Sequence, residues 1–282
     1  MTNQLSDVPT SEGMDWKKFY ELLSLDRSGK PEEALLGFRA LLTAGDSTQD
    51  QVAVLVAIAG ALRKLGRASE ASQTLDQIYT MAGIDQIEAA PAFYLDACLK
   101  IDAREWNEAL ELLDRAIVDD TSTSSSAQDK NFYQSVREKR GIVLYELGRY
   151  REAAQVLEDS VKFAGEDEKP AIQYYLGRCS YNLGDLTRSI RALEEALSGN
   201  LHCEWVPSAH YILGLAHHWR EEYARALLQF EWCIEHDQDG RVAKWKVLTA
   251  LVNTLKALGM KHEAAKYASL LKSTPHVADQ KD

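Results

Sequence analysis

The sequence contains no long hydrophobic run. Its longest apolar stretch, residues 52–62, has about half the length that a membrane-spanning helix needs. We interpret this stretch as a helix buried between its neighbours, with an exposed apolar face as the alternative. Residues 1–13 are polar and lack a basic start followed by an apolar run. We therefore expect no secretory signal and no membrane insertion.

The chain also has few cysteines and no excess of basic residues. Cys98, Cys179, Cys203 and Cys233 lie far apart, without the paired spacing of metal sites or disulfide frameworks. Three of them fall within helical patterns, where a thiol behaves as a small apolar group, so we expect a reducing, cytoplasmic compartment. The net charge of −11 argues against nonspecific nucleic-acid binding and disfavours anionic membranes.

Catalytic and cofactor motifs are missing as well. The chain has no HExxH histidine pair, and the Gly29–Lys30 dipeptide lacks the upstream glycine of a phosphate-binding loop. Residues 235–246 begin like a calcium-binding loop, but Lys246 stands where the loop needs a glutamate. We interpret this segment as a helix-ending turn. We expect no enzyme activity, no cofactor and no bound metal.

What the sequence does contain is a recurring unit in which a short turn leads into a helix. The helix opens with a small residue, about 36 to 38 residues after the previous one, with one longer gap before the fourth copy. Another apolar-periodic helix precedes each turn, which predicts an all-α solenoid of helix-turn-helix units. The small residues are Ala34, Ala71, Ala109, Ala153, Ser189, Ala226 and Ala264.

Two further features of the units have physical explanations. Gly141, Gly177 and Gly214 in the first helices are expected to face small residues of the second helices, because a close approach requires short side chains. A glutamate precedes the small residue in five units, where negative charge complements the helix dipole, and a recurring catalytic acid is the alternative. These are Glu33, Glu70, Glu108, Glu152 and Glu263.

These units resemble tetratricopeptide repeats. The resemblance implies a right-handed superhelical solenoid of about seven repeats, whose first helices line a concave protein-binding groove. The spacing is a few residues longer than usual and the closing proline is missing, which leaves related helical-hairpin repeats as an alternative. The best matches are Gly141, Gly148, Tyr150, Ala153 and Leu157; Leu176, Gly177, Gly184 and Leu193; and Leu213, Gly214, Tyr223, Ala226 and Phe230.

We expect one repeat domain over residues 14–273. Residues 1–13 and 274–282 are predicted to be disordered. The serine-rich segment 119–130 is predicted to be a flexible loop that accounts for the longer gap between repeats. An ordinary linker explains this segment, with a regulatory phosphorylation site as the alternative.

The candidate binding residues lie on the stripe of the first helices that the groove would expose. Tyrosine, arginine and histidine are enriched at binding hot spots because they offer a large area with a polar tip. For each tyrosine, packing against the adjacent repeat is the alternative. The predicted residues are Tyr94, Tyr145, Tyr174, Arg178, Tyr181, Tyr211, His218 and Asn253.

Some members of this family grip the C-terminal carboxylates of chaperones through a lysine three residues before the repeat's Leu-Gly glycine and an asparagine just after it. The corresponding pairs in this chain do not reproduce that clamp. A mixed aromatic and weakly cationic groove suits an extended or helical peptide with hydrophobic anchors, and Arg178 could take one acidic group. The pairs are Glu138 and Ile142, Tyr174 and Arg178, and Tyr211 and Leu215.

The sequence thus predicts a non-catalytic scaffold or adaptor that binds a protein or peptide partner in its groove. A structural or self-associating subunit, with a homo-oligomer as its form, is the alternative. A peptide-sensing regulator is a variant of the first prediction.

Overall fold

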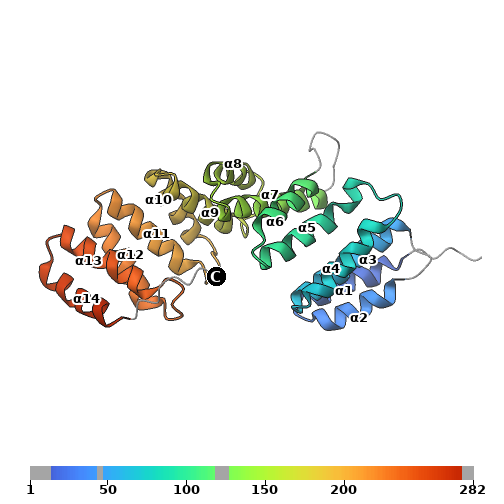
Figure 1. Cartoon of the computed structure of the whole chain (residues 1–282), viewed down its shortest axis with the longest axis horizontal. Helices are drawn as coiled ribbons and strands as arrows, with labels where there is room; N and C mark the ends of the chain where they lie inside the picture. The colour runs from blue at the N-terminus through green and yellow to red at the C-terminus, as the bar shows by residue number, and fades with distance from the viewer. Residues whose placement is uncertain (1–13, 43–46, 118–126, 275–282) are drawn as a thin grey trace, which may run out of the picture. The chain divides into compact units, whose positions relative to one another are not determined.

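The computed structural model describes residues 14–42, 47–117 and 127–274 of the chain. Within these residues it contains fourteen α-helices and no β-strand, which confirms the predicted all-α repeat solenoid (Figure 1). The helices are α1 (Trp16–Arg27), α2 (Pro31–Leu41), α3 (Thr48–Lys64), α4 (Ala68–Thr80), α5 (Gln86–Asp102), α6 (Trp106–Ala116), α7 (Ala127–Glu146), α8 (Tyr150–Val161), α9 (Lys169–Asn182), α10 (Leu186–Ser198), α11 (Val206–Trp219), α12 (Tyr223–His236), α13 (Lys244–Ala257) and α14 (Lys261–Ser273).

The segments predicted to be disordered or flexible fall largely outside the described residues. This holds for residues 1–13, for most of the segment 119–130, and for the tail after Thr274. The last four residues of the predicted loop are helical instead, because α7 begins at Ala127. Alanine, glutamine and lysine in this stretch have high helix propensity, which the serine-rich composition before them conceals.

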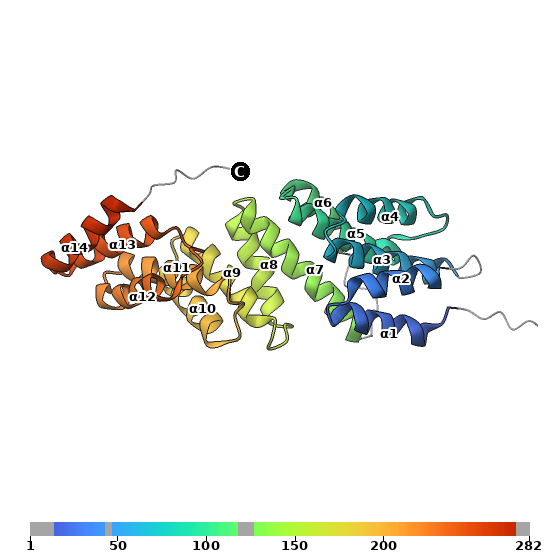
Figure 2. The ribbon, with the colours of Figure 1, turned by 90° about the horizontal axis from the view of Figure 1, so that it is seen from below.

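The contacts within the chain group the helices into two compact units. The first unit, residues 1–129, contains α1 to α6, and the second, residues 130–282, contains nearly all of α7 and the helices α8 to α14. In each unit, consecutive helices form hairpins, and the pairs α9–α10 and α13–α14 lie side by side in Figures 1 and 2. The repeat region predicted as residues 14–273 therefore comprises two groups of hairpins.

Most of the hairpin turns need a left-handed residue, and glycine usually supplies it. At Gly66, with φ of 71°, the Arg67 N–H donates to the Leu62 carbonyl at 2.9 Å, which ends α3 in the expected way. Gly29, Gly148, Gly184 and Gly259 are also left-handed. Two turns instead place Arg104 and Glu221 at a φ of 61°, where a side chain is strained.

The predicted glycines of the first helices do permit close helix packing. A Cβ atom added at Gly141, Gly177 or Gly214 would lie 2.6 Å from a side chain of the following helix. The nearest side chains are Leu157, Leu193 and Phe230, one turn beyond the small residues that we expected to face the glycines. The glycines therefore face these larger residues instead of the small ones. Residues four apart lie on the same face of a helix, and the longer side chain extends to the glycine of the neighbouring helix.

The periodic glutamates lie in the first turns of the second helices, as predicted. Several also form local ion pairs. Arg67 donates two hydrogen bonds of 2.6 Å to Glu70, and Arg149 pairs with Glu152 in the same way. A structural role at the helix start therefore explains these residues.

The apolar stretch 52–62 forms most of α3 and supplies the core of the first unit. Val54, Ile58 and Leu62 are nearly inaccessible to solvent, whereas Val56 and Gly60 on the opposite face are half-buried. None of residues 52–62 is exposed, so the stretch is a buried helix with one partly accessible face. Among the described helices, none has the length and hydrophobicity that a membrane span would need.

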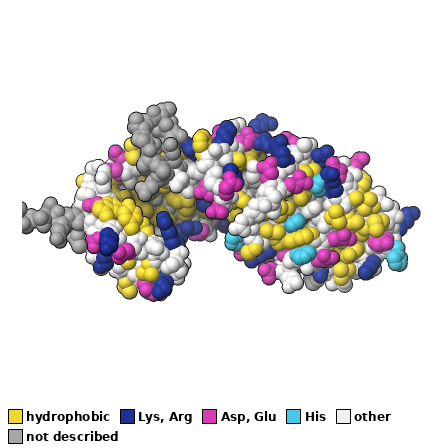
Figure 3. Space-filling view, turned by 180° about the vertical axis from the view of Figure 1, so that it is seen from behind, with side chains coloured by type: hydrophobic (Ala, Val, Ile, Leu, Met, Phe, Trp, Pro, Cys, Tyr) yellow, Lys and Arg dark blue, Asp and Glu magenta, His cyan; other side chains and the backbone are white. Residues whose placement is uncertain are grey.

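The surface chemistry differs along the chain. Figure 3 shows hydrophobic side chains gathered on part of the first unit, whereas on the second unit they are mixed with histidines and charged groups. In the first hairpin, Trp16, Tyr20 and Leu36 are 42%, 55% and 67% exposed. Exposed aromatic and aliphatic groups of this size on one hairpin indicate a surface available for contact.

Candidate functional site

Aromatic side chains of the second unit surround Arg178. Its guanidinium lies 4.2 Å from the ring centre of Tyr145 on α7, and 5.3 and 5.4 Å from those of Tyr174 and Tyr175 on α9. Trp205, just before α11, stacks on Tyr174 with centroids 5.6 Å apart and rings 4° from parallel. We call these five residues the arginine–tyrosine cluster.

The helix α9 positions the centre of this cluster. Tyr174 and Arg178 are four residues apart, so their side chains lie on the same face, one turn from each other. Gly177 lets α9 approach the Leu193 side chain of α10, which fixes the helix that carries Arg178. Stacking against the rings restricts the arginine side chain to one orientation.

The charge of Arg178 has no counterion within the described part of the chain. No carboxylate forms an ion pair with it, and its Nε atom is buried without a hydrogen-bond acceptor. Burial acts to lower the pKa of Arg178, but Tyr174, Tyr145, Tyr175 and the more distant Glu146 outweigh it, so this pKa is raised. The cluster therefore presents a permanently charged guanidinium with unused donors.

Tyr174 requires a correction to the predicted contact surface. It is only 2% exposed, between Trp205 and Tyr175, so its ring supports Arg178 from beneath and is not available to a ligand. The stripe of first-helix residues predicted from the sequence did not include Tyr175 or Trp205. Tyr175 lies one residue off the stripe, and Trp205 lies in the connection before α11, where no helical periodicity signals its position.

The other predicted residues of the second unit lie on successive first helices, where α9 contacts α11 and α11 contacts α13. Tyr181 and Tyr211 are half-buried, and burial raises the pKa of Tyr211, with a smaller contribution from Tyr181. His218 Nδ1 is 2.8 Å from the Thr254 hydroxyl oxygen of α13, and Asn253 is exposed.

We define the first-helix face as the exposed or half-buried residues of this surface in the second unit: Tyr145, Arg178, Tyr181, Tyr211, His218 and Asn253. The remaining predicted residue, Tyr94, is half-buried on α5 and belongs to the first unit. The structure therefore brings Tyr145, Tyr174 and Arg178 into one cluster and places the other second-unit residues along the same set of helices.

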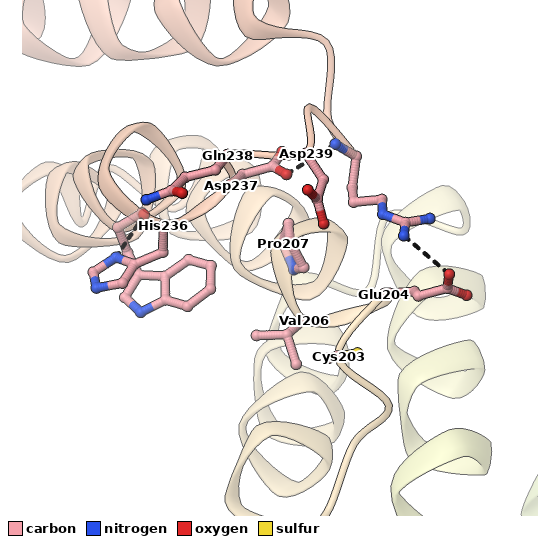
Figure 4. A pocket seen from close by; sticks show the side chains of 10 residues that line it. Cys203, Glu204, Val206, Pro207, His236, Asp237, Gln238 and Asp239 are labelled. Carbon is pink, nitrogen blue, oxygen red and sulfur yellow. Dashed lines mark hydrogen bonds and ion pairs between the residues drawn. The ribbon is translucent and has the colours of Figure 1, made fainter.

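A pocket of about 420 Å³ lies beside α11 and the connection between α12 and α13 (Figure 4). Three of its charged side chains are paired within the protein. The Asp237 carboxylate accepts the Arg241 and Val242 N–H groups at 2.8 and 2.7 Å, and Arg241 pairs with Glu204 at 3.0 Å. This geometry confirms the helix-ending turn predicted for the calcium-like segment, and no group of three potential metal ligands occurs among the described residues.

Next to this pocket, two histidines enclose an indole ring. His210 and Trp232 stack with centroids 3.8 Å apart, and His236 stacks on Trp232 at 4.7 Å. His210 Nδ1 also lies 2.7 Å from Gln229 Oε1. Burial lowers the pKa of His210, and His236 lowers it further, so the neutral imidazole is favoured.

Three of the four cysteines are buried, and one is exposed. Cys179 and Cys233 are buried, and burial raises the pKa of each thiol to about 12. Cys98 is also buried, whereas Cys203 is exposed at the pocket. All four are free, so the three helical cysteines act as the small apolar groups that the sequence predicted.

Comparison with solved structures shows the fold. The chain is similar to MamA, with 18% identity, a TM-score of 0.52, and coverage of 66% of this chain and 91% of MamA. It is similar to the Pseudomonas aeruginosa pilF protein, with 19% identity, a TM-score of 0.60, and coverage of 80% and 93%. YrrB shows 16% identity, a TM-score of 0.50, and coverage of 74% and 91%. No curated protein sequence matches the chain.

Two family models match the sequence itself, and both describe tetratricopeptide repeats. One matches residues 18–128, which span the helices of the first unit. The other matches residues 138–201 and 181–231, which include α8 to α11 of the second unit. With the helical hairpins, the glycine turns and the close contacts at Gly141, Gly177 and Gly214, these matches lead to one conclusion: the chain belongs to the tetratricopeptide repeat family.

Proposed function

We propose that this protein is a non-catalytic scaffold or adaptor that binds a segment of a partner protein on the first-helix face of its second unit. The observation that carries the proposal is Arg178, a half-buried cation that is stacked on tyrosines and has no counterion among the described residues. The four free cysteines support a reducing, cytoplasmic compartment for this activity.

A carboxylate of the partner is the natural complement of Arg178. The guanidinium can donate two parallel hydrogen bonds to one carboxylate, and a hydrogen bond to a charged group contributes about 1.5–3 kcal/mol. Stacking on Tyr145 holds the guanidinium in place before binding, so little side-chain entropy is lost. The partner therefore gains both affinity and a fixed register from one acidic group.

The net charge of the chain limits how acidic the partner can be. With a net charge of −11, the protein repels a polyanion at long range, whereas a single carboxylate is attracted by the nearby guanidinium of Arg178. Tyr181 and Tyr211 offer half-buried rings with polar tips, which suit apolar anchors beside that carboxylate. The proposed ligand is a peptide segment with one acidic residue among apolar ones.

The comparisons support a binding role in general terms. YrrB is described as a tetratricopeptide repeat protein with an unusual peptide-binding site, so this fold presents peptide sites in that protein. This chain lacks the lysine and asparagine with which some family members bind chaperone C-termini, so we expect its ligand to differ from those C-termini. Fold similarity at this level does not carry a partner from one protein to another.

Affinity capture with matched variants tests the proposal. Arg178→Gln removes the charge on the first-helix face, and Arg191→Gln makes the same change on the exposed side of α10. Proteins retained from native lysate by the wild type and by Arg191→Gln should be lost with Arg178→Gln, at unchanged helical content. Identical sets of captured proteins with all three would contradict the proposal.

Self-association is the second candidate, and the first hairpin favours it. Trp16, Tyr20 and Leu36 are exposed on α1 and α2, and a copy of the chain could cover them. Sedimentation velocity over a hundredfold range of concentration decides this point. A monomer at every concentration would exclude a self-associating structural subunit.

A further inference from the structure

The first helix of the chain, α1, carries an accessible apolar stripe. Trp16, Tyr20 and Leu23 follow one another at helical spacing, so they lie on one face of α1. Trp16 is 42% exposed, Tyr20 is 55% exposed and Leu23 is half-buried. The rings of Trp16 and Tyr20 contact each other, and both contact the buried ring of Phe19, which anchors them to the core. We call Trp16, Tyr20 and Leu23 the α1 stripe.

The register of the repeats shows what such a stripe normally contacts. Tyr20, Leu95 and Tyr175 each lie fourteen positions before the small residue that opens the second helix of their repeat. Tyr175 meets Tyr145 of the preceding first helix edge to face, with ring centres 5.7 Å apart. Leu95 is the side chain nearest to Gly60 of the preceding first helix. Among the described residues no repeat precedes α1, so Tyr20 lies on the open end face of the repeat array, where a preceding repeat would pack.

The last repeat does not complement the α1 stripe. Asn253 on α13 has the register of Gly60, eleven positions before the small residue of its repeat, but it is polar and exposed. The helices α13 and α14 together carry six lysines and a single glutamate. They would repel Lys17 and Lys18, which lie beside the stripe. A head-to-tail contact between copies would therefore place the apolar stripe against a polar surface and like charges against each other.

We propose that two copies of this protein associate through their α1 stripes as an antiparallel, twofold-symmetric pair. The proposal rests on self-association, the second candidate function, and assigns it to one surface and one geometry. A twofold contact uses the same patch of both copies, so one exposed stripe can cover another. When the antiparallel pairing is centred on the stripe, Trp16 of each copy lies opposite Leu23 of the other, which removes apolar surface of both copies from water.

Charges beside the stripe favour the antiparallel arrangement. Lys17 and Glu21 are exposed on the same flank of α1, and neither forms an ion pair with a described residue. In a twofold antiparallel pair this flank of one helix meets the same flank of the other, so Lys17 of each copy faces Glu21 of its partner copy. The two groups then differ in height along the helix axis by about 1.5 Å, the rise of one residue. A parallel pair would separate the two flanks and leave these charges unmatched.

Pairing through α1 has a consequence for the scaffold. The α1 stripe belongs to the first unit, whereas the first-helix face that we propose as the binding surface belongs to the second unit. The two surfaces share no residue, so a dimer carries two first-helix faces on one assembly. A partner that contains two copies of the recognised segment would bind such an assembly more tightly than it binds a single face, because the second contact is intramolecular.

Exchange of charges between copies tests the contact. Lys17→Glu and Glu21→Lys each place like charges opposite each other, so each variant alone should dimerise about tenfold more weakly than the wild type in sedimentation velocity. Mixed in equal amounts, the two variants should recover wild-type dimerisation, because each copy supplies the charges that the other lacks. Charge repulsion within one helix cannot produce this recovery, since each variant keeps it in the mixture. A mixture that dimerises as weakly as its components would overturn the antiparallel pairing.

Matched variants separate this surface from the rest of the molecule. Tyr20→Glu should dissociate the dimer, whereas Leu228→Glu, at a similarly exposed position on α12, and Arg178→Gln on the first-helix face should leave it intact. A dimer that Tyr20→Glu retains would overturn the assignment to the α1 stripe while self-association itself stands. A wild-type protein that is monomeric at every concentration would overturn both. Neither result bears on partner binding at the first-helix face, which capture with Arg178→Gln tests separately.

Discussion

At the residue scale, the most informative side chain is Arg178. Most other basic residues near a carboxylate form local pairs, as Arg67 does with Glu70 and Lys162 does with Asp159. Arg178 instead lies over Tyr145, and its Nε atom has no acceptor. The surrounding tyrosines and Glu146 outweigh the desolvation of this cation, so it stays charged although no carboxylate of the described residues forms an ion pair with it. A ligand carboxylate can pair with it, which is why we place recognition at this residue.

Residue-level strain gives a prediction at the turn between α11 and α12. Glu221 is exposed and has a φ of 61°, a conformation that costs a non-glycine residue about 1–2 kcal/mol. Glu221→Gly should therefore stabilise the protein by about 0.5–1 kcal/mol, the net of relieved strain and greater freedom of the unfolded chain. Urea denaturation measures this change. Glu221→Ala is the control, since it keeps the strain, and an equal gain in both variants would contradict this explanation.

At the element scale, the glycines of the first helices divide into two kinds. Gly177 on α9 is required by the approach of Leu193, whereas a Cβ at Gly60 on α3 would have its nearest neighbour, Leu95 Cδ2, at an ordinary contact distance of 4.0 Å. The same residue type therefore serves close packing in one helix and has no such packing requirement in the other. Sequence alone does not separate the two cases, because both glycines lie in the interior of an apolar helix.

This distinction predicts opposite effects of one chemical change. Gly60→Ala should stabilise the protein by about 1 kcal/mol through helix propensity alone. Gly177→Ala should destabilise it by about 1–2 kcal/mol, because the new Cβ would lie 2.6 Å from Leu193 Cγ and 3.3 Å from its backbone nitrogen. Thermal and urea unfolding of the two variants measure both values. The same sign for both would refute the assignment of these glycines.

At the scale of the whole molecule, the sequence predicted the repeats better than the site. Helical hairpins and glycine turns follow from local spacing and φ requirements, and the first-turn glutamates follow from the helix dipole. The burial of Tyr174 and the contact of Trp205 with it depend on how α9 meets the start of α11. A stripe of residues on one helix does not predict which residue of a connecting segment will pack against it.

Stability of the whole protein should also depend on pH through two half-buried histidines. Burial lowers the folded-state pKa of His210 and of His218 below the unfolded value of about 6.5. Near these pKa values the unfolded chain therefore binds more protons than the folded protein. The two histidines contribute stability above the unfolded pKa, and this contribution is lost as the pH falls through the folded pKa. The free energy of unfolding should fall between about pH 7 and pH 5.

A single variant isolates the contribution of His210. His210→Phe keeps a ring against Trp232 but removes the titrating group, so its stability should vary less with pH than that of the wild type. Urea denaturation at a series of pH values provides the comparison. If the free energy of unfolding of His210→Phe varied with pH as steeply as that of the wild type between pH 7 and pH 5, His210 would not contribute to the pH dependence.

The proposed function assigns partner binding to the first-helix face of the second unit, and site-specific photo-crosslinking tests it most directly. A photoreactive phenylalanine replaces Tyr181 on that face, or Leu228 on α12 as the control, which is 63% exposed. After irradiation in cells, the Tyr181 position should yield discrete adducts with a partner protein that disappear when Arg178→Gln is added, and the Leu228 position should not. Adducts of equal yield with and without Arg178, or the same adducts from both positions, would contradict the proposed binding face.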